Sequence, residues 1–209
     1  MGAIQKILPD ANVLFSATTR NWLFLLKLTA MNKMFTVATT EDILAETIYS
    51  LRRKYPSMDG SQTRKISEKL RESSDYVIQD FDGSRDFPFA DTADQHVHAA
   101  AIAGEVDILL SFDKGFLNAN DKITEALPYE IMSPDQFFLL VDDSSPELVF
   151  TVAALQAEYV RAQRGIGVVK SLEQAGCPLF AERVNKRHFA ALSGAIHTIH
   201  DFTQQTKQT

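Results

Sequence analysis

The stretch from residue 91 to residue 116, DTADQHVHAAAIAGEVDILLSFDKGF, most constrains the fold of this chain. It consists of an acidic turn, an alanine-rich helical pattern and a short apolar run that is typical of a buried strand. Asp94 is expected to open the helix, and Asp113 is expected to follow the strand. In an α/β sheet, the carboxyl ends of the strands and the helices that follow them meet at one edge, where ligands bind. Two carboxylates at such an edge predict either a divalent-cation site or a pair of helix caps.

Short apolar runs alternate with helical patterns from the N-terminus to about residue 140. Strands are expected at residues 4–10, 34–38, 76–81 and 129–132, and in the apolar part of the first stretch. Helices are expected at residues 21–31, 40–54 and 62–73. This alternation predicts an α/β fold in which helices cover both faces of a mainly parallel sheet.

The sequence changes character after Asp142, where the polar segment DDSSPE reads as a hinge that begins a helix. Amphipathic patterns follow at residues 148–163, 169–175 and 179–194, and no further strand is indicated. We therefore expect an α/β domain at residues 1–140 and a small, all-helical C-terminal extension at residues 141–209.

Composition restricts the function classes. The formal net charge of −6 argues against a generally basic nucleic-acid coat. It does not exclude a nuclease, because carboxylates that bind metal ions themselves make a protein acidic. The single Cys177 permits no intrachain disulfide. The N-terminus lacks the pattern of a secretory signal, and the densest apolar run, residues 22–28, is too short to span a bilayer. A cytoplasmic location is the expectation.

Four acids are expected where separate elements approach the same edge of the sheet. They are Asp10 at the end of the first strand, Glu46 on the helix after the second strand, Asp94 and Asp113. Oxygen ligands suit Mg²⁺ or Mn²⁺, and such ions can activate water and stabilise charge on phosphoryl oxygens. Each acid also has a simpler explanation, because Asp commonly caps helices and Glu commonly lies at the solvated margin of a helix.

Several segments resemble, in order, the motifs of the PIN-domain family. They are LPDANVLFSA, EDILAETIYSLRRK, DTADQHVHAAAIA and LLSFDKGF, and the closest resemblance is to VapC-like toxins of bacterial toxin–antitoxin pairs. The later segment SLEQAGCPLFAERV is similar to the helical extension of one branch of these proteins. The resemblance implies a three-layer α/β/α, flavodoxin-like sandwich. It also implies a Mg²⁺- or Mn²⁺-dependent endoribonuclease that a small cognate antitoxin protein inhibits, and a homodimer is expected on the same ground.

The resemblance also assigns roles to individual residues. The four acids would hold the metal, which would activate water for in-line attack on an RNA phosphodiester. Asn12 and Ser111 would orient the carboxylates by hydrogen bonding, although both are also ordinary turn residues. Asp91 is an alternative to Asp94. We favour Asp94, because the apolar residues Val97 and Ala100 of its helix then face the core.

Contacts with RNA are expected from basic residues. The most basic region contains Arg52, Arg53, Lys54, Arg64, Lys65, Lys69 and Arg71. These side chains read either as phosphate contacts or as the solvated faces of two helices. Arg20 follows the first motif and is the best single prediction for a phosphate contact. His96 and His98 lie two residues apart on a helix and so face different ways, and packing or surface roles are favoured for both.

Two further readings compete with a ribonuclease toxin. A PIN-like module could bind RNA or protein without catalysis. A phosphatase or receiver domain also places an Asp at the end of the first strand. The second of these is disfavoured, because Asn12-Val13 follows Asp10 where a phosphatase is expected to carry a second Asp and a Thr.

Overall fold

The structure is a computed structural model that describes residues 4–83, 87–89, 94–163 and 165–189. The chain divides into two compact units, Met1–Phe137 and Phe138–Thr209. The predicted domain boundary after residue 140 falls inside helix α8 (Pro134–Ser144), which spans this division.

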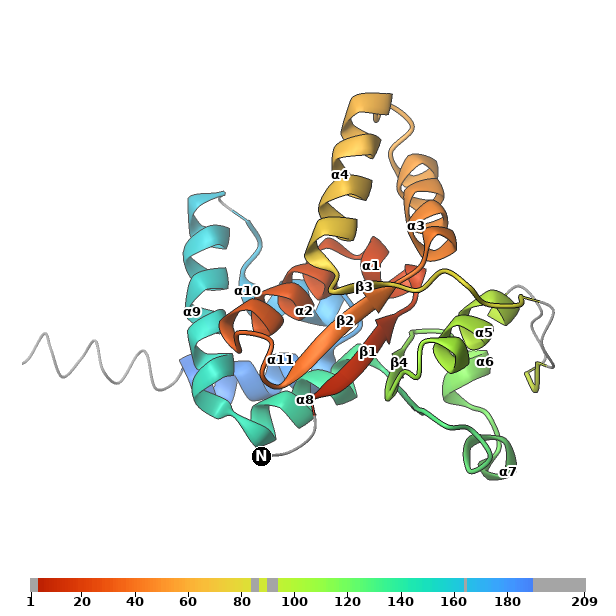
Figure 1. Cartoon of the computed structure of the whole chain (residues 1–209). Helices are drawn as coiled ribbons and strands as arrows, with labels where there is room; N and C mark the ends of the chain where they lie inside the picture. The colour runs from red at the N-terminus through yellow and green to blue at the C-terminus, as the bar shows by residue number, and fades with distance from the viewer. Residues whose placement is uncertain (1–3, 84–86, 90–93, 164, 190–209) are drawn as a thin grey trace, which may run out of the picture. The chain divides into compact units, whose positions relative to one another are not determined.

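A five-stranded sheet forms the centre of the first unit (Figure 1). Its strands are β1 (Gln5–Pro9), β2 (Phe35–Thr39), β3 (Tyr76–Val77), β4 (Ile108–Leu110) and β5 (Glu130–Met132). The strand order is β3-β2-β1-β4-β5, and every neighbouring pair is parallel. The predicted α/β class is thus confirmed, and the sheet with its surrounding helices is a PIN-like α/β/α sandwich. The helical C-terminal part of the prediction is confirmed as well.

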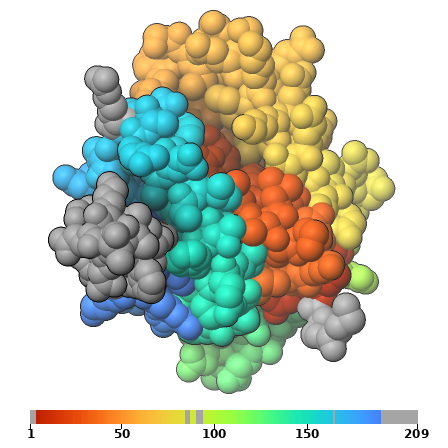
Figure 2. Space-filling model, turned by 90° about the vertical axis from the view of Figure 1, so that its left-hand side faces the viewer, coloured from red at the N-terminus to blue at the C-terminus, as the bar shows by residue number. Residues whose placement is uncertain are grey.

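Helices connect the strands of this unit. They are α1 (Ala11–Phe15), α2 (Ala17–Thr29), α3 (Glu41–Lys54), α4 (Gly60–Ser73), α5 (Gln95–Ala103), α6 (Lys114–Leu117) and α7 (Asp121–Thr124). Helix α3 packs against both α1 and α4, and α3 and α4 form one continuous surface, coloured orange to yellow in Figure 2. The buried side of α3 carries Ile43, Leu44, Thr47 and Leu51, which recur at the helical spacing.

Strand β3 is shorter than the predicted strand at residues 76–81, and Asp75 explains where it starts. The backbone N–H of Asp75 donates to the Val37 carbonyl at 2.7 Å, and its carboxylate accepts from the Val37 N–H at 2.8 Å. The buried Lys27 ammonium pairs with the same carboxylate at 3.0 Å. Asp75 therefore fixes the N-terminal end of β3 to β2 through side-chain contacts that a strand pattern does not show.

The strand order creates a switch point between β1 and β4. The chain adds β2 and β3 on one side of β1 and then crosses to add β4 and β5 on the other side. The last residues of the two central strands are level, since Pro9 pairs with Leu110. The N–H of Asp10 then donates to the Leu110 carbonyl at 2.9 Å. In open parallel sheets, the crevice outside the strand ends at such a point is the usual ligand site.

The second unit has helices as its only regular structure within the described residues. They are α9 (Pro146–Ala162), α10 (Val168–Gln174), α11 (Pro178–Arg183) and the π-helix η2 (Val184–Phe189), together with the end of α8. The helix predicted at residues 179–194 is therefore divided into α11 and η2 as far as Phe189, and residues 190–194 lie outside the described part. Val149, Val152, Leu172 and Phe180 are buried in this unit.

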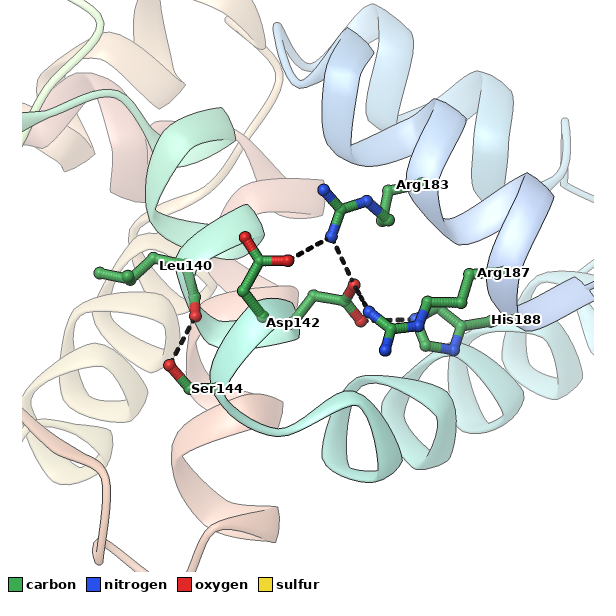
Figure 3. Close-up of polar contacts among 7 residues, drawn as sticks. Leu140, Asp142, Ser144, Arg183, Arg187 and His188 are labelled. Carbon is green, nitrogen blue, oxygen red and sulfur yellow. Dashed lines mark hydrogen bonds and ion pairs between the residues drawn. The ribbon is translucent and has the colours of Figure 1, made fainter.

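A buried carboxylate joins the helices of the second unit (Figure 3). Asp142 on α8 accepts from Arg183 Nη1 at 3.0 Å, from Arg187 Nη1 at 2.9 Å and from His188 Nε2 at 2.6 Å. Arg183 also pairs with Asp143 at 2.6 Å. The cluster thus ties α8 to α11 and η2 by charge as well as by apolar packing.

Within the described ranges, no helix is both long enough and apolar enough to cross a bilayer.

Candidate active site

Asp10 lies at the centre of the site, directly after β1 at the switch point. Only 3% of its surface is exposed. Its carboxylate accepts hydrogen bonds from the Ala11 N–H at 2.6 Å, the Asn12 side-chain amide at 2.5 Å and the Ser111 hydroxyl at 2.7 Å. All three donors are neutral. Burial raises the pKa of Asp10 above its ordinary value, and the hydrogen bonds from Ser111 and Ala11 oppose this rise only in part.

Ser111 follows β4 and connects the two central strands. Its hydroxyl donates to Asp10 Oδ2 and accepts from the Asn12 side-chain amide at 3.1 Å and from the Asp113 N–H at 2.9 Å. Asn12 completes the link, because its Oδ1 accepts from the Phe112 N–H at 3.1 Å. The structure therefore brings together Asp10, Asn12 and Ser111, and it gives both predicted supporting residues a direct hydrogen bond to the Asp10 carboxylate.

Asp113 is joined to this group through its backbone and also caps a helix. Its Oδ1 accepts from the Gly115 N–H at 2.5 Å and from the Phe116 N–H at 3.4 Å, at the start of α6. A Cβ at position 115 would lie 2.8 Å from that Oδ1. A larger residue at position 115 would therefore displace the Asp113 carboxylate from this position.

Glu46 approaches from α3, with 47% of its side chain exposed. Its negative charge is one of the causes that raise the pKa of Asp10, so the two carboxylates lie within electrostatic reach of each other. Glu46 Oε2 lies 3.8 Å from His96 Nε2.

His96 is thus a member of the site. Sequence reasoning instead predicted a packing or surface role for this residue. A protonated His96 lowers the pKa of Asp10, which is the opposite of the effect of Glu46. The sequence signal was its place two residues after Asp94 within a motif of the resemblance, and that position alone predicts no contact with α3. His98, by contrast, is buried, and its Nδ1 lies 2.7 Å from the Tyr129 hydroxyl. The two histidines face different ways, as predicted.

Asp94 occupies the N-cap position of α5, and its side chain makes no capping hydrogen bond to that helix. Val97 and Ala100 of the same helix are fully buried, as the preference for Asp94 assumed. Asp91, the alternative, lies outside the described residues. The structure connects Asp94 to the site through its helix, which also carries His96.

Arg20 lies on α2, and its Nη1 donates to the Leu14 carbonyl at 2.6 Å. Burial lowers the pKa of this guanidinium below its ordinary value. This guanidinium therefore supports the end of α1, and its role as a phosphate contact stays a prediction.

The donor atoms of the site can be tested against a divalent cation. Among the described residues, no three His, Cys, Asp or Glu side chains are grouped closely enough to hold a metal ion on their own. Mg²⁺, however, is usually bound by one or two carboxylates together with waters and substrate phosphates. Asp10 fits this pattern, because it is a carboxylate buried among neutral donors near a second acid. A cation there would offset the unfavourable free energy of burying the Asp10 charge. It would also offset the repulsion between Asp10 and Glu46.

Comparison with known families identifies the domain that contains this site. The sequence matches the PIN domain over residues 6–115, which is just over half of the chain. This range begins in β1 and ends at Gly115, two residues after Asp113, so it contains all four predicted acids. A comparison with curated proteins finds no significant match. PIN domains have a nuclease-type fold, generally cleave RNA and typically use divalent metal ions. On this match, the chain is a member of the PIN-domain family.

Proposed function

We propose that this protein is a Mg²⁺- or Mn²⁺-dependent endoribonuclease and acts as the toxin of a VapC-like toxin–antitoxin pair, on RNA in the cytoplasm. The observation that carries the catalytic part of the proposal is the environment of Asp10. This buried carboxylate has three neutral hydrogen-bond donors, none of them a lysine or arginine, and burial raises its pKa. It lies where a parallel sheet usually binds its ligand.

The cation would be held by the oxygens of Asp10, Glu46, Asp94 and Asp113. When bound, it would supply positive charge to the scissile phosphate and lower the pKa of a water molecule. Ser111 and Asn12 would hold the Asp10 carboxylate in a single orientation, since both donate to it. Gly115 would leave the room that the Asp113 carboxylate occupies.

The neutral donors have a consequence for metal binding. A lysine or arginine beside Asp10 would compete with a cation for the same carboxylate. Hydrogen bonds from an amide, a hydroxyl and a backbone N–H fix the carboxylate in place and leave its charge in excess. The site thereby combines rigidity with negative charge, which is the combination that a hard cation requires.

The direct test is cleavage of a labelled RNA by the purified full-length chain, with and without Mg²⁺ or Mn²⁺. We expect cleavage that stops with excess chelator, and a loss of at least about 10²-fold in Asp10→Asn and in Asp94→Asn. Asp121→Asn is the matched control, because Asp121 is an exposed acid in the first turn of α7. Cleavage that persists in both site variants or in chelator would overturn the proposal.

A non-catalytic PIN-like binding module is the second candidate, and the absence of a closed group of three metal-binding side chains among the described residues favours it. It predicts RNA binding without cleavage at any Mg²⁺ or Mn²⁺ concentration. The toxin role has a separate test. Expression of the wild-type chain should arrest growth, and co-expression of the small cognate antitoxin protein should relieve the arrest. Expression of Asp10→Asn alone should be harmless.

A further inference from the structure

A groove between α1 and α3 opens beside the site. It has a volume of about 500 Å³ and is lined by Asn12, Phe15, Glu46, Ser50, Arg53 and Lys54. Two of these residues, Asn12 and Glu46, belong to the candidate active site. The groove therefore leads directly to the carboxylates.

The α3 wall of the groove is a single helix face. Glu46, Ser50, Arg53 and Lys54 follow one another at spacings of four, three and one residues, which places them on one side of the helix. At 1.5 Å per residue, the wall from Glu46 to Lys54 is about 12 Å long. Its acidic end carries Glu46, which lies within electrostatic reach of Asp10, and its other end carries two cations. The groove thus has an acidic end at Glu46 and a basic end at Arg53 and Lys54.

The two basic side chains are available to an external anion. Arg53 and Lys54 are exposed, and neither forms an ion pair with any residue in the described ranges. Two other residues of the predicted basic region already have an acidic partner. Arg64 pairs with Glu68 and Arg71 pairs with Glu41, each at 2.6 Å. The Lys54 ammonium lies over the Phe15 ring at 5.0 Å and over the Tyr55 ring at 5.5 Å.

We infer that this groove holds a single-stranded segment of the RNA substrate, with phosphates on Arg53 and Lys54 and a base against the Phe15 ring. The inference rests on the proposed function and names the form of the substrate. A basic groove with an aromatic wall is the arrangement that binds single strands without strong sequence preference. A base-paired helix is instead recognised across its wide minor groove by its shape, whereas this groove offers two cations and one aromatic ring beside the site. Lys54 moves from the ring to a phosphate when the base occupies the ring.

The test measures binding of a short fluorescent RNA of mixed sequence to the full chain carrying Asp10→Asn, in Mg²⁺, at several salt concentrations. Removing two phosphate contacts should reduce the magnitude of the salt slope by about 1.4, since each contact to a single strand contributes about 0.7. We therefore expect this reduction in Arg53→Ala/Lys54→Ala. Phe15→Leu should weaken binding by about fivefold or more through lost stacking, with a smaller change in slope.

The matched control is Arg52→Ala/Lys65→Ala. It removes the same charge from exposed positions of α3 and α4 that do not line the groove. Equal slopes in the two double variants would overturn the inference, and so would equal affinity for the RNA and its annealed duplex. If only the groove variant loses binding of the small cognate antitoxin protein while RNA binding is unchanged, the groove docks a protein and the inference is wrong. Failure of the wild-type chain to cleave RNA is a separate result, because it would overturn the proposed function and leave this binding measurement intact.

Discussion

Asp10 and Asp142 are both buried carboxylates, with 3% and 0% of their surfaces exposed, but they have opposite kinds of partners. Asp142, in the second unit, accepts from two arginines and lies 2.6 Å from a histidine nitrogen. Asp10, in the first unit, accepts from a backbone N–H, an amide and a hydroxyl. One carboxylate is hydrogen-bonded to cationic side chains, and the three donors of the other are neutral.

The difference separates a structural ion cluster from a binding site. A buried charge that is paired with cations stabilises the contact between its helices but has little capacity for a ligand. A buried charge that is held by neutral donors stores unfavourable free energy, which a cation from solution can release. Burial alone therefore does not identify a functional acid, whereas the charge of its hydrogen-bond donors does.

The largest expected effect comes from Asp142→Asn. This change leaves two arginines and a buried histidine without their shared carboxylate, so we expect the free energy of unfolding to fall by on the order of 3 kcal/mol. Asp143→Asn is the control, because Asp143 is exposed and, within the described part of the chain, pairs with Arg183 alone. It should change stability by less than about 0.5 kcal/mol. Urea denaturation of the full chain measures both, and equal losses would remove the distinction between the two acids.

Divalent cations should stabilise the folded chain through Asp10 and not through Asp142. A ligand that binds only the folded state adds about 2.7 kcal/mol of stability at one hundred times its dissociation constant. We expect Mg²⁺ or Mn²⁺ to raise the melting temperature of the wild-type chain and of Asp142→Asn, but not that of Asp10→Asn. An equal rise in all three would mean that the metal binds elsewhere.

Ser111→Ala should cost less than the loss of the carboxylate itself. It removes one of the three donors that hold Asp10, and removal of such orienting groups commonly lowers metal affinity or activity by about 10–100-fold. Ser144→Ala is a matched change, since the Ser144 hydroxyl donates to the Leu140 carbonyl at 2.8 Å on an exposed surface (Figure 3). RNA cleavage and metal titration should be normal in that control. Ser111→Thr keeps the hydroxyl and should recover part of the loss.

The smallest effect is the pH dependence of stability in chelator. Because burial raises the pKa of Asp10 above 3.8 in the folded state, the folded chain binds this proton more tightly than the unfolded chain. The contribution of Asp10 to stability is therefore fully present below pH 3.8 and is lost as the pH rises through the folded-state pKa. The unfolding free energy of the wild type minus that of Asp10→Asn should decrease over this window. A constant or increasing difference would contradict the raised pKa.

The sequence predicted most of the first unit because its strands are short apolar runs and its helices have regular apolar faces. Asp10 and Ser111 could be assigned to one edge, since the carboxyl ends of parallel strands meet there. Their bond, between residues 101 positions apart in the chain, required only that the two strands be neighbours. The pairing of β1 with β4 itself was not predicted.

Contacts between distant side chains were less predictable. His96 approaches Glu46 only because α5 and α3 come together in the fold. Lys27 is buried only because Asp75, 48 residues away, supplies its carboxylate. The cluster around Asp142 likewise joins residues 41 to 46 positions apart. No periodic pattern encodes such pairs, because each depends on where a single polar group ends up after the apolar faces have packed.

The Ser111 hydroxyl has a chemical consequence of its own. A hydroxyl carries one hydrogen and two lone pairs, and here Asp10 takes the hydrogen while the Asn12 amide and the Asp113 N–H take the lone pairs. Ser111 consequently has no proton to give to a leaving group and no lone pair to direct at phosphorus. A covalent seryl–RNA intermediate is thus incompatible with this arrangement, and in the proposed reaction the attacking oxygen is not that of Ser111.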